Sequence, residues 1–441
     1  MEMLPRLHLS SSGLLNQIRS TFLKIPDHRS ELLSIPLADA LMSGLAVFGL
    51  KYPSLLKFDS ESGEKVVRHN LQTLYGVNKI PSDTQMREIL DEVDPNDLRV
   101  AYKKIFSTIQ RGNVLKSYRY LDEYYLISVD GTGQLSSEKV HCDQCCEKTS
   151  RNGKTTYYHQ LVGAVVVHPD KKLVIPLAPE PITKQDGDTK NDCERNASKR
   201  LLEHLRREHP HLKVIIIEDS LASNAPHIKL LKKLDMRFIL GAKPGDHKFL
   251  FNKVEEYVQS GNFKEHEITK EDSKTHKFRF INAVPLNKDN SDVLVNFLEY
   301  WEVGPKKTLH FTWVTDFFLS NDNVFEVMKG GRARWKVENE TFNALKNQGY
   351  NFEHNYGHGK KNLATIFMLL MMLAFLVDQT LEISCSLFQA SRKKLVSRTS
   401  LWERMRSLFL NFLIDSWDDM FIVLSTGPPG HNLRQKKAKD P

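Results

Sequence analysis

Two aspartates stand where a pair of metal-binding carboxylates would be expected. Asp130 follows the apolar run 124–129, and Asp219 follows the apolar run 213–217 after Glu218. Each run predicts a β-strand, and ligand sites in open α/β sheets form at the carboxyl ends of strands. Two Mg²⁺ ions roughly 4 Å apart, held by oxygen ligands, can clamp the attacking and leaving oxygens of a phosphodiester. A turn or cap role explains either aspartate alone, but the two together favour a metal site.

A third carboxylate is expected from a long helix predicted over residues 333–348. Glu338 is spaced from Trp335, Phe342 and Leu345 as a member of the apolar stripe would be. Glu340 lies four residues after Lys336, where a solvent-exposed ion pair explains it. A carboxylate on the face that docks on the sheet needs a partner, and a metal would supply one. We therefore choose Glu338 over Glu340.

Two basic residues on the same helix are candidate DNA contacts. Arg334 lies four residues before Glu338, where it can steady that carboxylate or hold a phosphate. Lys346 can contact DNA, although a solvated lysine near the negative end of the helix dipole explains it equally well.

The elements around these residues follow the order of an RNase H-like core. Strands are predicted at 124–129, 157–167 and 172–177, then a helix at 193–208, a strand at 213–217, a helix at 225–234 and a strand at 237–242. Strand-like pieces at 278–281, 295–301 and 308–314 interrupt this order and predict a β-rich insertion. The fold class is therefore α/β, with a mixed-sheet core, a β-rich insertion and a helical N-terminal region.

The predicted organisation has six parts. They are a helical N-terminal region that is a candidate for DNA binding or for plain helical packing (1–118), the first part of the core (119–246), the insertion (247–327), the last part of the core with the catalytic helix (328–380), a helical C-terminal region (381–426) and a disordered basic tail (427–441).

Composition limits the class of protein. The 441 residues exceed one ordinary domain, and 40% are hydrophobic, which is enough for a large core. The formal net charge of +8 suits a polyanionic partner such as DNA. The odd count of five cysteines argues against a secreted disulfide framework and favours a reducing cytosol. The apolar run 363–377 is shorter than the roughly 20 residues that span a bilayer, so we expect a buried or interface helix and no membrane contact.

A cysteine cluster follows the first predicted strand. Cys142 and Cys145 form half of a usual Zn²⁺ site, and His141, Cys146 or Cys193 can complete it. Reduced, partly buried thiols in a loop are the alternative. If zinc binds, we expect it to clip the loop 134–156 and to take no part in catalysis.

The chain resembles the DDE transposases of bacterial insertion sequences, in particular the group with a β-rich insertion before the last glutamate. The likeness covers most of residues 30–380. It is carried by the motifs at 129–133 (Val-Asp-Gly-Thr-Gly), 217–220 (Ile-Glu-Asp-Ser), 334–338 (Arg-Trp-Lys-Val-Glu) and 347–354 (Asn-Gln-Gly-Tyr-Asn-Phe-Glu-His). The resemblance implies that Asp130, Asp219 and Glu338 form the catalytic triad.

The sequence departs from such relatives at two positions. They often carry a tyrosine three residues before the arginine and a lysine seven after the glutamate. Gly331 and Leu345 stand there in this chain, with Lys346 one step further. The roles of those two residues in relatives, which are to steady a flipped base or a hairpinned end, are therefore not carried over.

The resulting hypothesis is an enzyme of DNA recombination: a transposase and endonuclease that binds two Mg²⁺ or Mn²⁺ ions. It would nick the ends of its own element and join the exposed 3′-OH to target DNA, as a homodimer on DNA. A nuclease of the same fold that only hydrolyses, and a non-catalytic DNA-binding derivative, are the alternatives. The recognised end sequence, the target preference and the route of excision do not follow from the sequence.

Overall fold

The computed structural model describes residues 7–29, 34–187, 190–269, 274–426 and 434–435. Most of the basic tail expected at 427–441, including Lys436, Lys437 and Lys439, lies outside the described residues. Within that tail the strand β14 (Arg434–Gln435) is described, and it pairs antiparallel with β13 (Phe412–Leu413).

The N-terminal region is helical, as predicted. Its helices are α1 (Ser11–Phe22), α2 (Leu37–Gly49), α3 (Leu55–Ser62), α4 (Lys65–Tyr75), α5 (Asp83–Asp91) and α6 (Pro95–Arg111). The helix start expected at residues 81–83 is α5, where the Ser82 side chain accepts from the backbone of Gln85 and the Gln85 side chain accepts from Ser82 in return. This capping box satisfies two amides that the first turn leaves unpaired.

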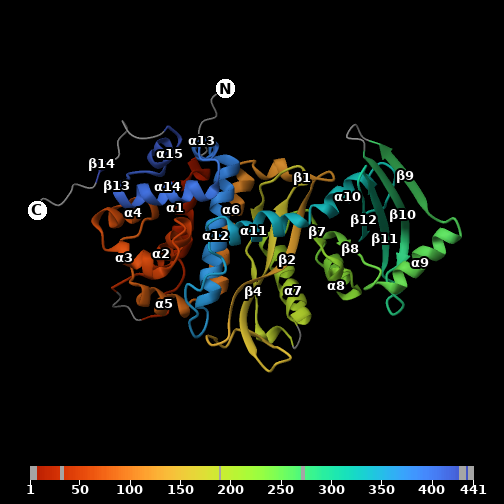
Figure 1. Ribbon diagram of the computed structural model, residues 1–441, viewed down its shortest axis with the longest axis horizontal. Coiled ribbons are helices and arrows are strands. Elements are labelled where there is room, and N and C mark those ends of the chain that lie inside the picture. Colours follow the sequence, from red (N-terminus) through yellow and green to blue (C-terminus); the bar gives the residue numbers. More distant parts are fainter. Residues whose placement is uncertain (1–6, 30–33, 188–189, 270–273, 427–433, 436–441) are drawn as a thin grey trace, which may run out of the picture.

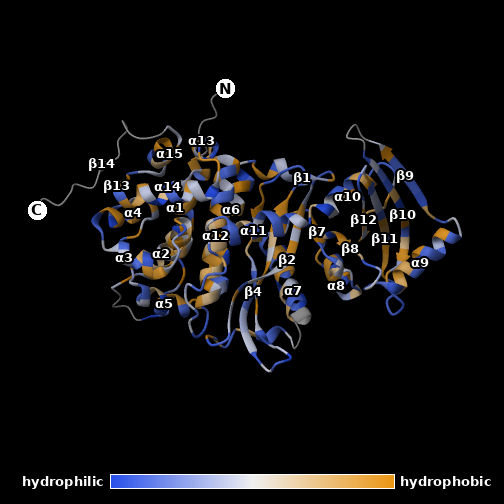
Figure 2. Ribbon diagram, viewed as in Figure 1, coloured by the Kyte–Doolittle hydropathy of each residue, from blue (hydrophilic) through white to orange (hydrophobic). Residues whose placement is uncertain are grey.

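The C-terminal helices pack against the N-terminal ones, so the two ends of the chain form one helical lobe (Figure 1). These helices are α12 (Leu363–Ser384), α13 (Ser386–Lys394), α14 (Arg398–Asn411) and α15 (Trp417–Thr426). The central helix α12 contacts α2, α5 and α6. Figure 2 shows many hydrophobic residues along these packed helices and mostly polar residues in the loops at the lower edge.

Helix α12 contains the apolar run noted in the sequence and continues to Ser384, which makes it 22 residues long. By length and composition this helix alone, among the described residues, could cross a membrane, but its most apolar stretch is wholly buried inside the fold. The run therefore forms a buried helix, as predicted. Its burial explains the hydrophobicity without a bilayer.

The rest of the molecule is built on one mixed sheet. Its strands run in the order β3-β4-β2-β7-β8-β12-β11-β10-β9, with β1, β5 and β6 attached beside this path. The core strands are β1 (Arg119–Tyr120), β2 (Tyr124–Ser137), β3 (Cys146–Thr149), β4 (Thr155–Val167), β5 (Ile175–Pro176), β6 (Glu180–Ile182), β7 (Val214–Glu218) and β8 (Arg237–Gly241). Strands β2, β7 and β8 are parallel, and β4 is antiparallel to β2. This mixed α/β arrangement is consistent with the RNase H-like fold expected.

The β-rich segment extends the same sheet. It contains α9 (Lys248–Gln259), β9 (Lys264–Thr269), β10 (Thr275–Pro285), β11 (Leu294–Val303) and β12 (Thr308–Thr315). Strand β12 pairs antiparallel with β8, so the hydrogen-bonded ladder passes from core to insertion without a break. In Figure 1 these green strands and α9 stand at the end of the molecule opposite the helical lobe.

The helix predicted over 333–348 is not one regular helix. Helix α10 (Val324–Arg332) ends before it, a π-helical stretch η5 covers Val337–Phe342, and α11 (Asn343–Asn347) completes the segment. Trp335, which the predicted apolar stripe included, is 49% exposed. A π-turn adds a residue to the turn and shifts the register of one face, a change that apolar spacing does not reveal.

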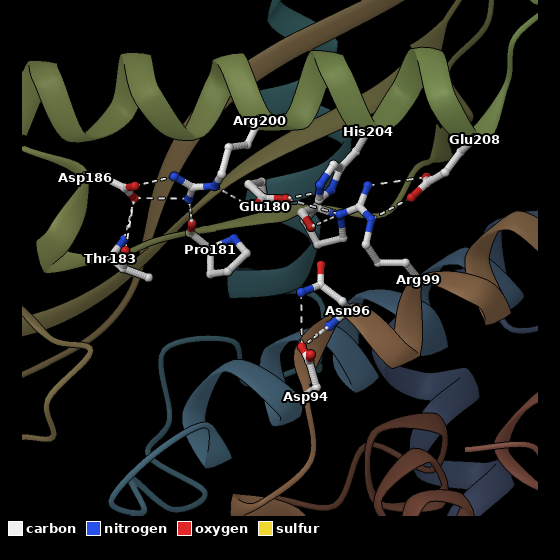
Figure 3. Close-up of polar contacts among 11 residues, drawn as sticks. Asp94, Asn96, Arg99, Glu180, Pro181, Thr183, Asp186, Arg200, His204 and Glu208 are labelled. Carbon is white, nitrogen blue, oxygen red and sulfur yellow. Dashed lines mark hydrogen bonds and ion pairs between the residues drawn. The ribbon is translucent and has the colours of Figure 1, made fainter. Parts of the chain in front are cut away.

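A buried ion-pair network joins the helical lobe to the sheet (Figure 3). Arg99 of α6 binds Glu180 of β6 at 3.2 Å and Glu208, at the end of α7 (Lys190–Glu208), at 2.6 Å. Arg200 of α7 binds Glu180 at 2.9 Å and also pairs with Asp186. Burial raises the pKa of Glu180, while the two arginines act in the opposite direction. Helix α6 is thus fixed against both β6 and α7.

Candidate active site

The pairing of two parallel strands brings Asp130 and Asp219 to the same place. Ser128 of β2 is the partner of Ile217 of β7, so each aspartate lies two residues beyond that pair. Strand β7 ends at Glu218, and Asp219 follows it directly. The sequence had predicted that the other strand, β2, ends just before Asp130. The strand instead continues past Asp130 to Ser137. Asp130 therefore lies inside a strand, beside the point where its parallel neighbour ends.

The electrostatic surroundings of Asp130 show that the three candidate carboxylates lie near one another. Burial is the largest influence on the Asp130 carboxyl and raises its pKa, and Asp219 and Glu338 raise it further. Arg334 and the backbone amide of Gly131 lower it in part. Three chain segments far apart in sequence thus contribute negative charge to the surroundings of Asp130.

Arg334 connects the late helical segment to this position. Its Nη1 lies 2.9 Å from Oδ2 of Asp130, while its guanidinium stands 4.4 Å from the centre of the exposed Trp335 ring. The hydroxyl of Ser128 donates to the backbone carbonyl of Arg334 at 2.7 Å, which ties the start of the segment to β2. Arg334 steadies Asp130 in this structure, whereas the sequence had suggested Glu338 as its partner.

Glu338 and Glu340 face different neighbours. Both side chains are half-exposed, and both lie in the π-helical stretch η5. Glu338 acts on Asp130, whereas Glu340 acts on the ammonium group of Lys336. The Lys336 ammonium donates to the Lys171 carbonyl at 2.6 Å and is not within ion-pair distance of Glu340, so the ion pair expected for Glu340 is not formed. The choice of Glu338 as third carboxylate stays a prediction.

Asp219 and its neighbour Glu218 have distinct environments. Glu218 is buried and fully engaged, since His227 lies 2.6 Å from one carboxyl oxygen and Ser198 donates to the other at 3.1 Å. Asp219 is exposed and accepts a hydrogen bond from the amide of Leu221 at 2.9 Å. Asp219 is therefore the one of the two whose carboxylate opens to solvent.

A cavity of about 640 Å³ opens beside the aspartates, between β2, β7 and the helices α7 and α8 (Ala225–Lys233). Asp130 and Asp219 line it together with Arg195, Lys199 and other residues. A further acidic residue, Glu194 of α7, also lines it: a Cβ added to Gly131 would lie 2.8 Å from the Glu194 carboxyl carbon. Nothing in the sequence order singled out Glu194, because its helix is remote from β2 along the chain.

Comparison with known families decides what kind of protein this is. The model of a family described as the transposase DDE domain matches residues 123–376, which is more than half of the chain. The chain belongs to this transposase family. No curated protein matches the sequence. The matched range contains all three candidate carboxylates, and the family acts on nucleic acid.

The remaining basic candidate of this transposase-family chain has a local partner. Lys346, in α11, pairs with Glu353 at 3.0 Å, and its side chain is 27% exposed. Leu345, beside it, is buried. The structure thus shows Lys346 in an intramolecular ion pair at the C-terminal end of α11, and a contact with DNA stays a prediction.

Two cysteines of this transposase-family chain gather with two histidines that the sequence had not suggested. Cys142, Cys145, His159 and His358 are buried, and one ligand atom of each lies within 4.8 Å of the others. His141, Cys146 and Cys193, which the sequence had offered as ligands, lie outside this group. His141 is exposed and stacks on Tyr157, and the Cys193 thiol donates to the Gly187 carbonyl at 3.1 Å. Sequence proximity favoured His141, whereas β4 and a distant loop supply the imidazoles.

Proposed function

We propose that this protein is a DNA transposase that nicks the ends of its own element and joins the resulting 3′-OH to target DNA. The observation that supports it best is the convergence of Asp219 and Glu338 on Asp130, inside the range matched by the transposase DDE domain. In this proposal the partner is DNA, the active form is a homodimer on DNA, and the enzyme works in the bacterial cytoplasm.

The three carboxylates suit hard divalent cations. They supply oxygen ligands, which Mg²⁺ and Mn²⁺ prefer, and their mutual repulsion is relieved when cations bind between them. Asp130, Asp219 and Glu338 would hold the two ions. Bound ions would lower the pKa of water and stabilise charge on the phosphodiester oxygens.

The chain's own groups would place the DNA. Arg334, now paired with Asp130, can exchange that carboxylate for a phosphate oxygen, because guanidinium binds both. The exposed ring of Trp335 beside it offers an apolar surface to a base. Arg195 and Lys199 on the cavity wall add positive charge along the path of the backbone. The Cys/His cluster takes no part in this chemistry.

A cleavage assay on DNA that carries the ends of the encoding element tests the proposal. We expect cleavage that requires Mg²⁺ or Mn²⁺. Asp130→Asn, Asp219→Asn and Glu338→Gln should each reduce the rate by at least about 1,000-fold, because loss of a carboxylate removes a metal ligand. Glu340→Gln is the matched control and should cleave at nearly the wild-type rate. Unimpaired cleavage by Asp130→Asn would point to another active site.

A second assay separates transposition from simple hydrolysis. Pre-cleaved ends with a free 3′-OH are supplied together with plasmid DNA. A transposase joins them in a metal-dependent reaction, while a nuclease of the same fold leaves them unjoined. Joined products that Glu338→Gln fails to form support the proposal, and their complete absence with active wild-type enzyme contradicts it.

A further inference from the structure

We infer that Cys142, Cys145, His159 and His358 form a closed structural zinc site. The four side chains come from three separate parts of the chain. Cys142 and Cys145 lie in the connection between β2 and β3, His159 lies in β4, and His358 lies in the connection between α11 and α12. A metal ion at this point would fasten the hairpin region of the sheet to the segment that follows Glu338.

The distances between the ligand atoms match tetrahedral zinc. With Zn–S bonds near 2.3 Å and Zn–N bonds near 2.0–2.1 Å, a tetrahedron places two sulfurs about 3.8 Å apart, two nitrogens about 3.3 Å apart and sulfur from nitrogen about 3.6 Å. In the structure Cys142 Sγ and Cys145 Sγ are 3.9 Å apart, and the Nε2 atoms of His159 and His358 are 3.3 Å apart. Three of the four sulfur–nitrogen distances are 3.4, 3.4 and 3.0 Å, and the fourth, between Cys142 and His358, is within 4.8 Å.

The ligand types of this cluster also favour Zn²⁺ over the Mg²⁺ expected at the candidate active site. Thiolate and imidazole ligands favour Zn²⁺, whereas Mg²⁺ takes oxygen. Two thiolates and two neutral imidazoles would leave the complex with Zn²⁺ uncharged, which suits a buried position. The two sulfurs are too far apart for a disulfide, whose bond is near 2.05 Å. Four protein ligands leave no open position for a substrate, so the role is structural.

The backbone around the site is arranged to present these ligands. The amide of Cys142 donates to Sγ of Cys145 at 3.5 Å, a contact of the kind that orients metal ligands. His358 is followed by Gly359, whose left-handed backbone (φ +67°) strongly favours glycine. Asp91 then accepts from the amides of Lys360 and Leu363, which anchors the loop at the start of α12. The loop that carries His358 is therefore held in place on its C-terminal side.

Metal analysis of the purified full-length protein tests the site. We expect one zinc per chain by elemental mass spectrometry after purification under reducing conditions. Cys145→Ser and His358→Asn should each weaken zinc binding at least about 100-fold, because each removes a ligand of a four-ligand site. Cys146→Ser and His141→Asn, which alter neighbours outside the cluster, are the matched controls and should retain one zinc. Wild-type protein that neither carries nor takes up zinc would overturn the inference.

Cobalt substitution of the wild-type protein gives a readout that does not depend on whether a ligand variant folds. Co²⁺ in the wild-type site should show the intense visible bands of tetrahedral cobalt and a thiolate-to-metal charge-transfer band. Asp130→Asn should leave both unchanged, since the candidate active site is separate. The spectrum of six-coordinate cobalt without the charge-transfer band would exclude thiolate ligation and overturn the inference.

Discussion

At the residue scale, Arg334 sets the charge balance beside the candidate carboxylates. It pairs with Asp130 at 2.9 Å and lies against the ring of Trp335. In Arg334→Gln we expect the DNA cleavage rate at saturating Mg²⁺ to fall about 100-fold, equal to about 2.7 kcal/mol of transition-state stabilisation. The reason is the loss of a phosphate-binding cation from the site. Single-turnover cleavage of an element-end duplex measures this rate.

Arg334→Lys separates charge from shape in the same assay. Lysine keeps the positive charge but has neither the planar fork nor the stacking surface of arginine, so we expect an intermediate rate. Equal thermal unfolding of the variants and the wild type would show that the fold is intact. A wild-type rate in Arg334→Gln would mean that the ion pair with Asp130 is structural alone.

At the scale of elements, α10 packs closely on β12 at Gly331. A Cβ added to Gly331 of α10 would lie 2.5 Å from Nε1 of Trp313 in β12, whose indole is buried. The side chain of Trp313 thus fills the space that a side chain at position 331 would need.

Gly331→Ala should therefore destabilise the protein. Overpacking against a rigid ring costs more than the gain in helix propensity returns, so we expect the free energy of unfolding to fall by about 1–2 kcal/mol. Urea denaturation followed by tryptophan fluorescence measures it. Gly245→Ala is the control, because nothing lies within 4 Å of its added Cβ. Greater stability in Gly331→Ala would show that Trp313 moves aside freely.

The elements of the core could be predicted from the sequence because their patterns are local. The apolar run 213–217 became β7, and the helix expected at 225–234 became α8. The π-helical stretch and the exposure of Trp335 could not be predicted, since a register shift inside a helix leaves the apolar spacing nearly unchanged. The continuation of β2 past Asp130 was also missed, because Asp-Gly reads as a turn.

The residues of the candidate sites could likewise be predicted only in part. Asp130 and Asp219 could be proposed from strand ends, and Cys142 and Cys145 from their spacing. His159 and His358 carry no local signal, because their neighbourhood is created by tertiary packing between β4 and the loop before α12. Residue spacing does not reveal such a cluster, because one of its histidines, His358, lies far along the chain from its cysteines.

At the scale of the whole molecule, Arg99 holds the helical lobe to the sheet. Arg99→Leu would leave Glu180 buried with less compensation, so we expect a loss of about 3–5 kcal/mol of stability. Faster limited proteolysis and a lower urea midpoint would show it. Lys213→Gln, which breaks an exposed pair with Glu123, is the control and should cost less than about 1 kcal/mol. Wild-type resistance in Arg99→Leu would mean that apolar packing alone joins the two parts.

The same junction makes stability depend on pH through His209. Its ring packs on Phe106 of α6 with centroids 4.5 Å apart. Burial lowers the pKa of His209 to about 4, and nearby cations act in the same direction; they are Lys103, Arg99 and Arg206. In the unfolded chain the pKa of this histidine is about 6.5. Between that pH and about 4, the unfolded state therefore binds a proton that the folded state does not bind. The contribution of neutral His209 to the free energy of unfolding is therefore complete above a pH of about 6.5 and declines as the pH falls toward 4.

His209→Phe should reduce this decline, because phenylalanine keeps an aromatic ring against Phe106 and cannot bind a proton. Between pH 7 and pH 4 we expect the wild type to lose about 3 kcal/mol more than the variant, from a pKa difference of roughly 2.5. Urea midpoints measured across that range give the comparison. His211→Asn, at an exposed position two residues on, should follow the wild type. Parallel curves for His209→Phe and the wild type would show that His209 takes up its proton without opening the junction, and that the acid sensitivity of the fold arises elsewhere.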